Sequence, residues 1–242
     1  MTTFYNHAFY LVPVRKATYE IEMALWNKST ELNMSHLGLT GWADIPSRFR
    51  SIDLSNNALR SIPTMHPPLT QLDLSNNKLK TIAEGDLPLS LEVLTLNGNE
   101  LTEISWLPPN LKELYIRRNK LTRICALPSG LQVADFLHNQ LESLPELPAS
   151  LTTLYVGRNR LKSLPLLPSA LSMLYVSHNQ LTTLPDVPPG LTELDVSVNR
   201  LTELPESLQR CVRLERLWHV DNPLVHLPAL PPQNADLGNS AE

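Results

Sequence analysis

The sequence predicts a solenoid, with short parallel strands stacked along a concave side and extended, proline-rich segments along the convex side. Three observations predict this fold. Two consecutive segments, 151–170 and 171–190, carry leucine, valine, asparagine and proline at the same positions. An asparagine recurs about every 20 residues, and prolines recur with the same period. A unit of this length cannot close a core alone, so each coil must stack on its neighbours.

The spacing of the apolar residues identifies the repeat. Counted from Leu151, leucine stands at the first, fourth and eleventh positions, valine at the sixth and asparagine at the ninth. This is the pattern L-x-x-L-x-L-x-x-N-x-L of leucine-rich repeats, and the frame fits residues 29–233. The ninth position holds Asn57, Asn77, Asn99, Asn119, Asn139, Asn159, Asn179, Asn199 and Asn222. An amide there has two donors and an acceptor, so we expect it to bond the backbone of adjacent coils.

Composition narrows the class of protein. Of the 242 residues, 42% are hydrophobic and only 6% aromatic, which predicts an aliphatic core. A formal charge of −4 does not favour nucleic acid, because binders of phosphate backbones carry a basic excess. The N-terminus is a poor secretory signal, and no stretch reaches the ~18 apolar residues of a membrane helix. With two cysteines, Cys125 and Cys211, we expect reduced thiols rather than a disulfide framework.

Residues 1–28 are expected to form an N-terminal helical cap or a secretion segment. The spacing predicts a helix from Val14 to Lys28, beginning after Pro13. Its apolar face comprises Val14, Ala17, Ile21, Ala24 and Leu25. Such a helix would cover the open end of the first coil. A second apolar set, Tyr19, Met23 and Trp26, lies off that face and would either rest on the solenoid or contact a missing partner.

The repeats themselves vary at both ends. In the first, degenerate repeat Leu37 replaces the asparagine, and four residues are expected in the core: Leu32, Met34, Leu39 and Trp42. The third repeat is longer, so we expect a bulge at residues 83–86 on the convex side. In the ninth, 204–213 predicts a short helical turn. The last repeat places His219 at a core position, and residues 234–242 form a polar tail.

The convex segments are marked by proline. The stretch Leu144-Pro145-Glu146-Leu147-Pro148 is typical, and proline fixes φ near −65° and removes an N–H donor, which predicts a polyproline-like path. Units of about 20 residues with such backs and a helical N-terminal cap resemble the LPX-type leucine-rich repeats of bacterial type III effectors, the family of YopM, SlrP and the IpaH group. The resemblance covers residues 29–233.

The resemblance implies export without a Sec signal peptide, delivery to the host cytoplasm and recognition of a host protein along the concave face. Some members of this family carry a ubiquitin-ligase domain with a Cys-x-Asp motif, which neither Cys125-Ala126-Leu127 nor Cys211-Val212-Arg213 matches. Two alternatives therefore stay open. The chain would be the substrate-recognition domain of a ligase whose catalytic domain is absent, or an endogenous repeat scaffold of the bacterial cytoplasm.

Alternation along each strand exposes the third, fifth and seventh positions on the concave side, with the eighth at the rim. The fifth position reads Asp53, Asp73, Thr95, Tyr115, Asp135, Tyr155, Tyr175, Asp195 and Trp218. Aromatic residues and arginine are enriched at binding hot spots, so we expect a partly acidic protein partner here. The candidate partner-binding residues are Tyr115, Arg117, Arg118, His138, Tyr155, Arg158, Met173, Tyr175, His178 and Trp218, with Leu137 as an apolar neighbour. The alternative is that Tyr155 and Tyr175 only stabilise the sheet as a cross-strand pair.

Evidence for catalysis is weaker. Asp53 and Asp73 lie on adjacent rungs, a spacing that retaining glycosidases use, but nothing indicates an enclosing pocket. His138 and His178 lie two rungs apart, too far for one zinc ion. No phosphate-binding glycine loop or nucleophile-elbow motif occurs in the sequence. The sequence therefore predicts a non-enzymatic module without a metal or cofactor, and it leaves the oligomeric state open.

Overall fold

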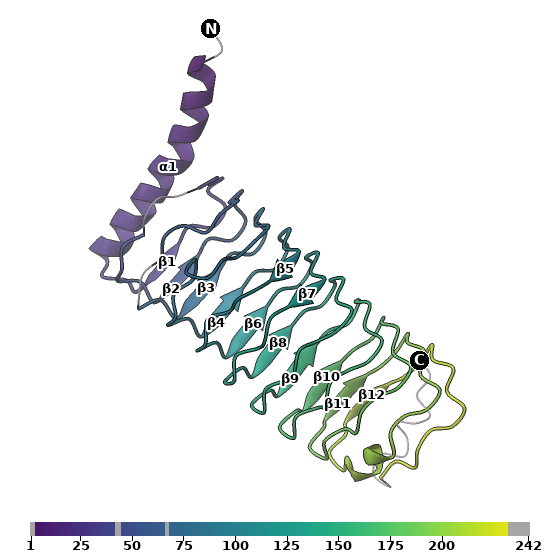
Figure 1. The fold of residues 1–242 in the computed structure, drawn as a ribbon. Coiled ribbons are helices and arrows are strands. Elements are labelled where there is room, and N and C mark those ends of the chain that lie inside the picture. Colours follow the sequence, from purple (N-terminus) through teal and green to yellow (C-terminus); the bar gives the residue numbers. More distant parts are fainter. Residues whose placement is uncertain (1–2, 42–44, 66–67, 232–242) are drawn as a thin grey trace.

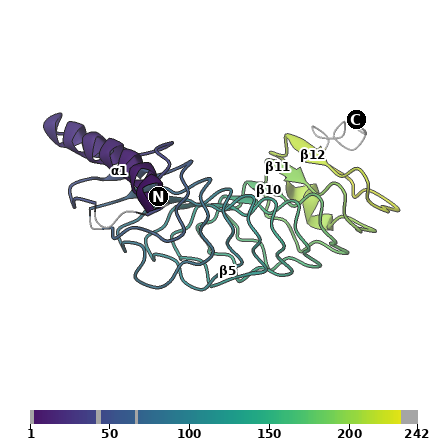
Figure 2. The ribbon, with the colours of Figure 1, turned by 90° about the horizontal axis from the view of Figure 1, so that it is seen from above.

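The computed structural model describes residues 3–41, 45–65 and 68–231, with side chains from residue 12 onward. It is a curved stack of coils with a helix, α1 (Thr3–Trp26), at its N-terminal end (Figure 1). Seen from above, the coils bend into an arc (Figure 2). The predicted leucine-rich repeat solenoid is confirmed.

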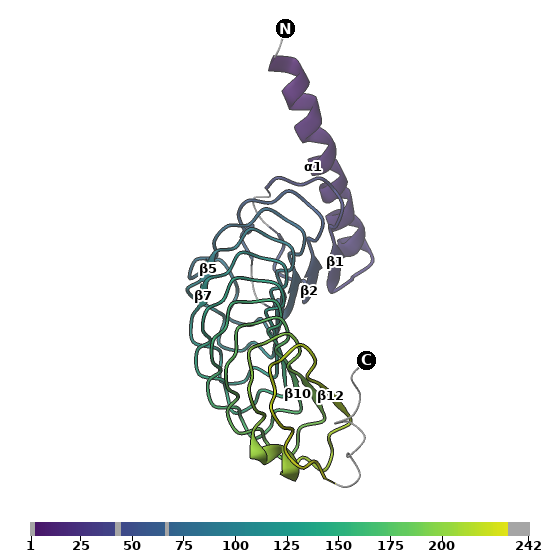
Figure 3. The ribbon, with the colours of Figure 1, turned by 90° about the vertical axis from the view of Figure 1, so that its right-hand side faces the viewer.

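A parallel sheet runs the length of the stack. Its ten strands in the described residues pair in register, each with the next: β1 (Glu31–Asn33), β2 (Ser51–Asp53), β3 (Gln71–Asp73), β4 (Val93–Thr95), β6 (Glu113–Tyr115), β8 (Val133–Asp135), β9 (Thr153–Tyr155), β10 (Met173–Tyr175), β11 (Glu193–Asp195) and β12 (Arg216–Trp218). On the other side of the coils, β5 (Glu103–Ile104) pairs with β7 (Arg123–Ile124) (Figure 3). Since the rungs are ~4.8 Å apart, side chains at the same position form rows along the stack.

The core is one continuous row of aliphatic side chains. In a typical coil Leu154, Val156 and Leu161 have no exposed surface, because the strand turns alternate side chains inward and the following loop closes over them. Phe49 and Phe136 are the largest side chains in this core. Each coil shares its apolar surface with two neighbours, so stability depends on stacking.

The asparagine ladder bonds the backbone as expected. The Asn159 amide donates to the carbonyls of Phe136 at 2.9 Å, in the preceding coil, and of Val156 at 3.0 Å, in its own coil. Its oxygen accepts the Leu141 N–H at 3.0 Å. The same set of bonds recurs at Asn139, Asn179 and Asn199. Each asparagine thus satisfies buried polar groups of two coils at once.

The convex side lacks regular structure over most of its length, as its prolines predict. Pro205 has φ −65° and ψ 140°, within the polyproline II region. The predicted short helical turn is present as a 3₁₀ helix, η1 (Glu206–Arg210). The predicted bulge is an exposed turn in which the Asp86 carboxylate accepts the Ala83 N–H at 2.7 Å. Gly85, at φ 93°, adopts a conformation that a side chain would disfavour.

The N-terminal helix differs from its prediction. It begins at Thr3 and continues through Pro13, because a proline inside a helix removes one N–H donor without forbidding the helix. Of the expected apolar face, Ala17 and Ile21 are buried and Ala24 is half-buried against the core. The expectation was wrong for Val14 and Leu25, which are exposed because the helix rests on the first coil along a narrower line.

The helix ends at Trp26, earlier than the predicted Lys28, and a turn follows. Lys28 has φ 56°, its N–H bonds the Leu25 carbonyl at 3.1 Å, and the Ser29 N–H bonds the Ala24 carbonyl at 2.9 Å. This left-handed turn stops the helix and directs the chain into β1.

In the terminal coils most predictions are confirmed. In the first coil Leu32, Met34 and Leu39 are buried as predicted. In the last, His219 is half-buried, and its Nε2 atom is buried without a partner among the described residues. Trp42 and the polar tail, 234–242, lie outside the described residues.

Candidate partner-binding surface

An aromatic stack crosses the C-terminal half of the concave sheet. The rings of Tyr155 on β9 and Tyr175 on β10 stack with centroids 4.7 Å apart and planes 18° apart. Trp218 on β12 leans over the intervening rung to within 6.1 Å of Tyr175. Both tyrosines are half-buried, and Trp218 is 37% exposed. The structure therefore brings together three predicted site residues, including the cross-strand pair, and leaves aromatic surface open to solvent.

Arg117 is committed to an intramolecular partner. Its Nε donates to the carboxylate of Asp135, a residue with no exposed surface, and its guanidinium lies 5.6 Å from the centre of the Tyr155 ring. Burial raises the pKa of Asp135, although the Leu137 N–H and Arg117 both favour its ionised form. Arg117 compensates this buried charge and braces the aromatic stack, so it is not a free cation for a partner.

Two tyrosines on the sheet are held by carboxylates. The Tyr115 hydroxyl donates to Glu113 at 2.7 Å, and burial together with this bond raises the pKa of Tyr115 to about 12. The Tyr175 hydroxyl donates to Glu193, which also accepts from Arg216 at 2.9 Å. Burial and the contact with Glu193 raise the pKa of Tyr175 as well. Both phenols stay neutral near physiological pH and present fixed ring faces.

The rim beside the sheet holds side chains on a left-handed backbone. In the N-terminal half the eighth position is Asn56, Asn76 and Gly98, the residue types that tolerate φ near +55°. Further along the stack it is Arg118, His138, Arg158 and His178, all exposed, with φ between 53° and 60°. For residues with a side chain, this backbone conformation costs roughly 1 kcal/mol or more of free energy. The same conformation recurs at Val198, so the repeat turn imposes it, and these four side chains stand exposed at the rim.

A cationic ridge follows from these positions. The tenth position, next to the buried asparagine, adds Lys120, Arg160 and Arg200, all exposed. The cationic ridge is defined here as Arg118, Lys120, Arg158, Arg160 and Arg200, with His138 and His178 between them. No acidic residue occurs at the eighth or tenth position from Arg118 to Arg200. On a chain with net charge −4, this ridge is a local reversal of sign.

Sequence reasoning missed three members of the ridge. Lys120, Arg160 and Arg200 each follow the recurring asparagine of their own coil, outside the strand positions from which the site was predicted. The signal was present, since Arg-Asn-Lys, His-Asn-Gln, Arg-Asn-Arg and His-Asn-Gln follow one another in consecutive coils. Lys120 approaches Glu100 at 4.0 Å, whereas the described residues show no ion pair for Arg118, Arg158 or Arg160.

The remaining predicted residues frame the stack. Met173 is half-buried on β10, beside Tyr175, and Leu137 is half-buried just after β8. Arg158 and His178 lie at the rim of the same coils. The predicted residues, together with the braces and the ridge residues that the prediction missed, form a band with three layers: the aromatic stack, its carboxylate and arginine braces, and the cationic ridge.

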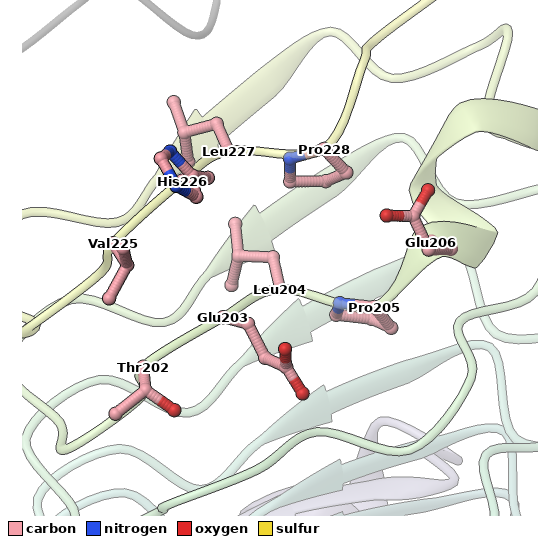
Figure 4. Close-up of a pocket in the computed structure, with 9 residues that line it drawn as sticks. All are labelled: Thr202, Glu203, Leu204, Pro205, Glu206, Val225, His226, Leu227 and Pro228. Carbon is pink, nitrogen blue, oxygen red and sulfur yellow. The ribbon is translucent and has the colours of Figure 1, made fainter.

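The two aspartates considered as a catalytic pair have structural roles. Asp53 and Asp73 each accept a backbone N–H two residues on, from Ser55 and Ser75, at 2.8 Å, so their carboxylates shape turns. Across the described residues no three His, Cys, Asp or Glu side chains gather as metal ligands would. A hollow between 202–206 and 225–228 opens on the convex side near the C-terminal end, and its acidic and histidine side chains do not converge (Figure 4).

Comparison with known proteins places the fold. Residues 68–88 and 190–211 match the family model described as Leucine Rich Repeat. No curated protein matches the chain. Among the helices in the described ranges, none is long and apolar enough to span a membrane. The repeats and the structure together define a leucine-rich repeat solenoid, a fold that presents an extended concave surface for binding proteins.

Solved structures of bacterial effectors share this architecture. YopM from Yersinia enterocolitica WA-314 superposes with a TM-score of 0.70 and 29% identity over 90% of this chain, which spans 61% of that one. YopM from Yersinia pestis, described as a leucine-rich effector protein, superposes with a TM-score of 0.71 and 29% identity. The match covers 92% of this chain and 80% of that one. A Shigella effector LRR domain superposes with a TM-score of 0.51 and 29% identity, over 87% of this chain and 77% of that one. The chain is similar to these effectors in fold.

Proposed function

We propose that the chain is the recognition module of a secreted bacterial effector and that it holds a host protein against its concave face. The observation that carries this proposal is the cationic ridge beside the aromatic stack, on a chain that is acidic as a whole. The similarity to YopM and the Shigella effector domain supports the effector part.

The chemistry of the band suits a protein partner. Aromatic side chains bury much area at little cost in conformational entropy, and the stacked rings are already fixed before a partner arrives. The ridge adds cations, of which Arg118, Arg158 and Arg160 have no ion pair among the described residues, and these attract an acidic surface and set the orientation of binding. A partner with an apolar patch flanked by Asp or Glu matches both layers.

The paired variant Tyr155→Ala/Arg158→Ala tests this proposal by removing one residue from each layer. Wild type and variant are used as bait in a host-cell lysate, and retained proteins are identified by mass spectrometry. The matched control is Lys162→Ala/Leu166→Ala, which removes one cation and one exposed apolar side chain from the convex side. We expect a host protein that the wild type and the control retain and the concave variant loses, since only that variant alters the band.

Two results would count against the proposal. Equal retention by all three chains would move the interface away from the concave face. A partner found in bacterial lysate and absent from host lysate would favour an endogenous scaffold. Thermal melting of each chain, read by circular dichroism, separates lost binding from lost folding.

A further inference from the structure

Helix α1 has an apolar stripe that the solenoid does not cover. Ala17, Ile21 and Ala24 pack on the first coil, next to β1. Four residues lie on the opposite side, exposed by 55%, 58%, 38% and 83% respectively: Val12, Tyr19, Met23 and Trp26. At 100° per residue these four fall within about 60° of one another, and their centre is roughly opposite the packed face. We call them the outer stripe.

We propose that the outer stripe is a dimer interface, on which α1 of a second copy of this chain packs in antiparallel orientation. The spacing of Val12, Tyr19 and Trp26 is seven residues, the period of a helix-pairing seam. A single row of exposed apolar residues is too narrow to hold a folded domain but matches the contact line of another helix.

Self-complementary charges select the partner and the orientation. Arg15 and Glu22 flank the stripe on one side, and Lys16 and Glu20 flank it on the other. In an antiparallel pair the same flanks of both helices meet, so with Tyr19 at the centre Arg15 lies near the partner's Glu22, and Lys16 near the partner's Glu20. A parallel pair would instead oppose the two basic residues and the two acidic ones. Within one copy of the chain, none of these four residues forms an ion pair among the described residues.

The position of α1 allows this contact. The helix projects past the first coil at the N-terminal end (Figures 1 and 3), and the side chains of its outer stripe are exposed. Two copies joined there would carry their solenoids on opposite sides, with both concave faces free. The seam from Val12 to Trp26 is only ~21 Å long. So small an interface predicts a weak dimer, with a dissociation constant on the order of micromolar.

Sedimentation of the full chain at concentrations from about 1 to 100 µM tests the dimer. We expect wild type to shift from monomer to dimer over this range, and Tyr19→Glu/Trp26→Glu to remain monomeric. Leu166→Glu, an exposed apolar residue on the convex side, is the control and should dimerise like wild type. A wild type that stays monomeric at the highest concentration overturns the proposal and leaves the stripe for another partner.

Charge exchange tests whether these four charges meet across the seam. Arg15→Glu/Lys16→Glu and Glu20→Lys/Glu22→Lys should each dimerise at least tenfold more weakly alone, because like charges then meet across the seam. An equal mixture of the two variants should form a heterodimer of about wild-type strength, which also shows that both are folded. A mixture that stays monomeric would contradict the antiparallel pair. The result is independent of the concave face, so it does not bear on the proposed host partner.

Discussion

Replacing Asn159 with alanine is expected to lower the free energy of unfolding by about 3 kcal/mol or more. The substitution deletes bonds to two coils and leaves the buried Leu141 N–H without an acceptor. The carbonyls of Phe136 and Val156 each lose one of two bonds and keep the one from Asn139 or Asn179. Water cannot take the place of the missing amide, because Asn159 is only 8% exposed. The cost combines this unsatisfied buried donor with the loss of the two other hydrogen bonds.

Urea unfolding followed by circular dichroism measures this loss. Asn222→Ala is a matched control, because Asn222 makes the same types of bond in the half-buried last repeat, where water reaches the vacated groups. The Asn222→Ala substitution should lower the free energy of unfolding clearly less than Asn159→Ala. A loss below about 1 kcal/mol for Asn159→Ala would contradict the role assigned to the ladder.

Reversing the centre of the cationic ridge, with Arg158→Glu/Arg160→Glu, is expected to weaken binding of the captured partner by about 100-fold or more. The pair of substitutions changes the local charge by four units in the middle of the ridge. Both side chains are exposed and without ion pairs in the described residues, so folding should be unaffected. Biolayer interferometry at low and high salt measures the affinity, and wild-type binding should weaken with salt much more than that of the variant.

Lys80→Glu/Lys162→Glu is the control for this effect, because it makes the same change of net charge on the convex side. We expect it to bind within a few-fold of wild type. If the control weakens binding as much as the ridge variant, the interaction depends on overall charge and not on the ridge.

The period of the sequence was sufficient to predict the fold. Each coil has the same sequence pattern and contacts only its neighbours. The stack is therefore determined by local features: the leucines at fixed positions, Asn159 and its equivalents, and the prolines of the convex side. The prediction was wrong where the repeat gives way to the cap. Spacing alone could not show that α1 continues through Pro13, or that Val14 and Leu25 miss the first coil.

For the candidate surface, the sequence predicted which residues line up along the sheet but not which of them pair with each other. Register placed Tyr155 beside Tyr175 because both occupy the fifth position. It could not show that Arg117 turns towards Asp135, because this depends on how deeply the carboxylate is buried. The prediction therefore overcounted Arg117 as a free cation and omitted Lys120, Arg160 and Arg200, which lie beyond the strands.

Photo-crosslinking from the concave face tests the central claim most directly. A benzophenone amino acid is placed at Met173, beside the aromatic stack, or at Leu166 on the convex side, and each chain is irradiated with the captured partner. The predicted result is a covalent adduct with the partner from position 173 and none from position 166. An adduct from position 166 alone would contradict recognition through the concave face.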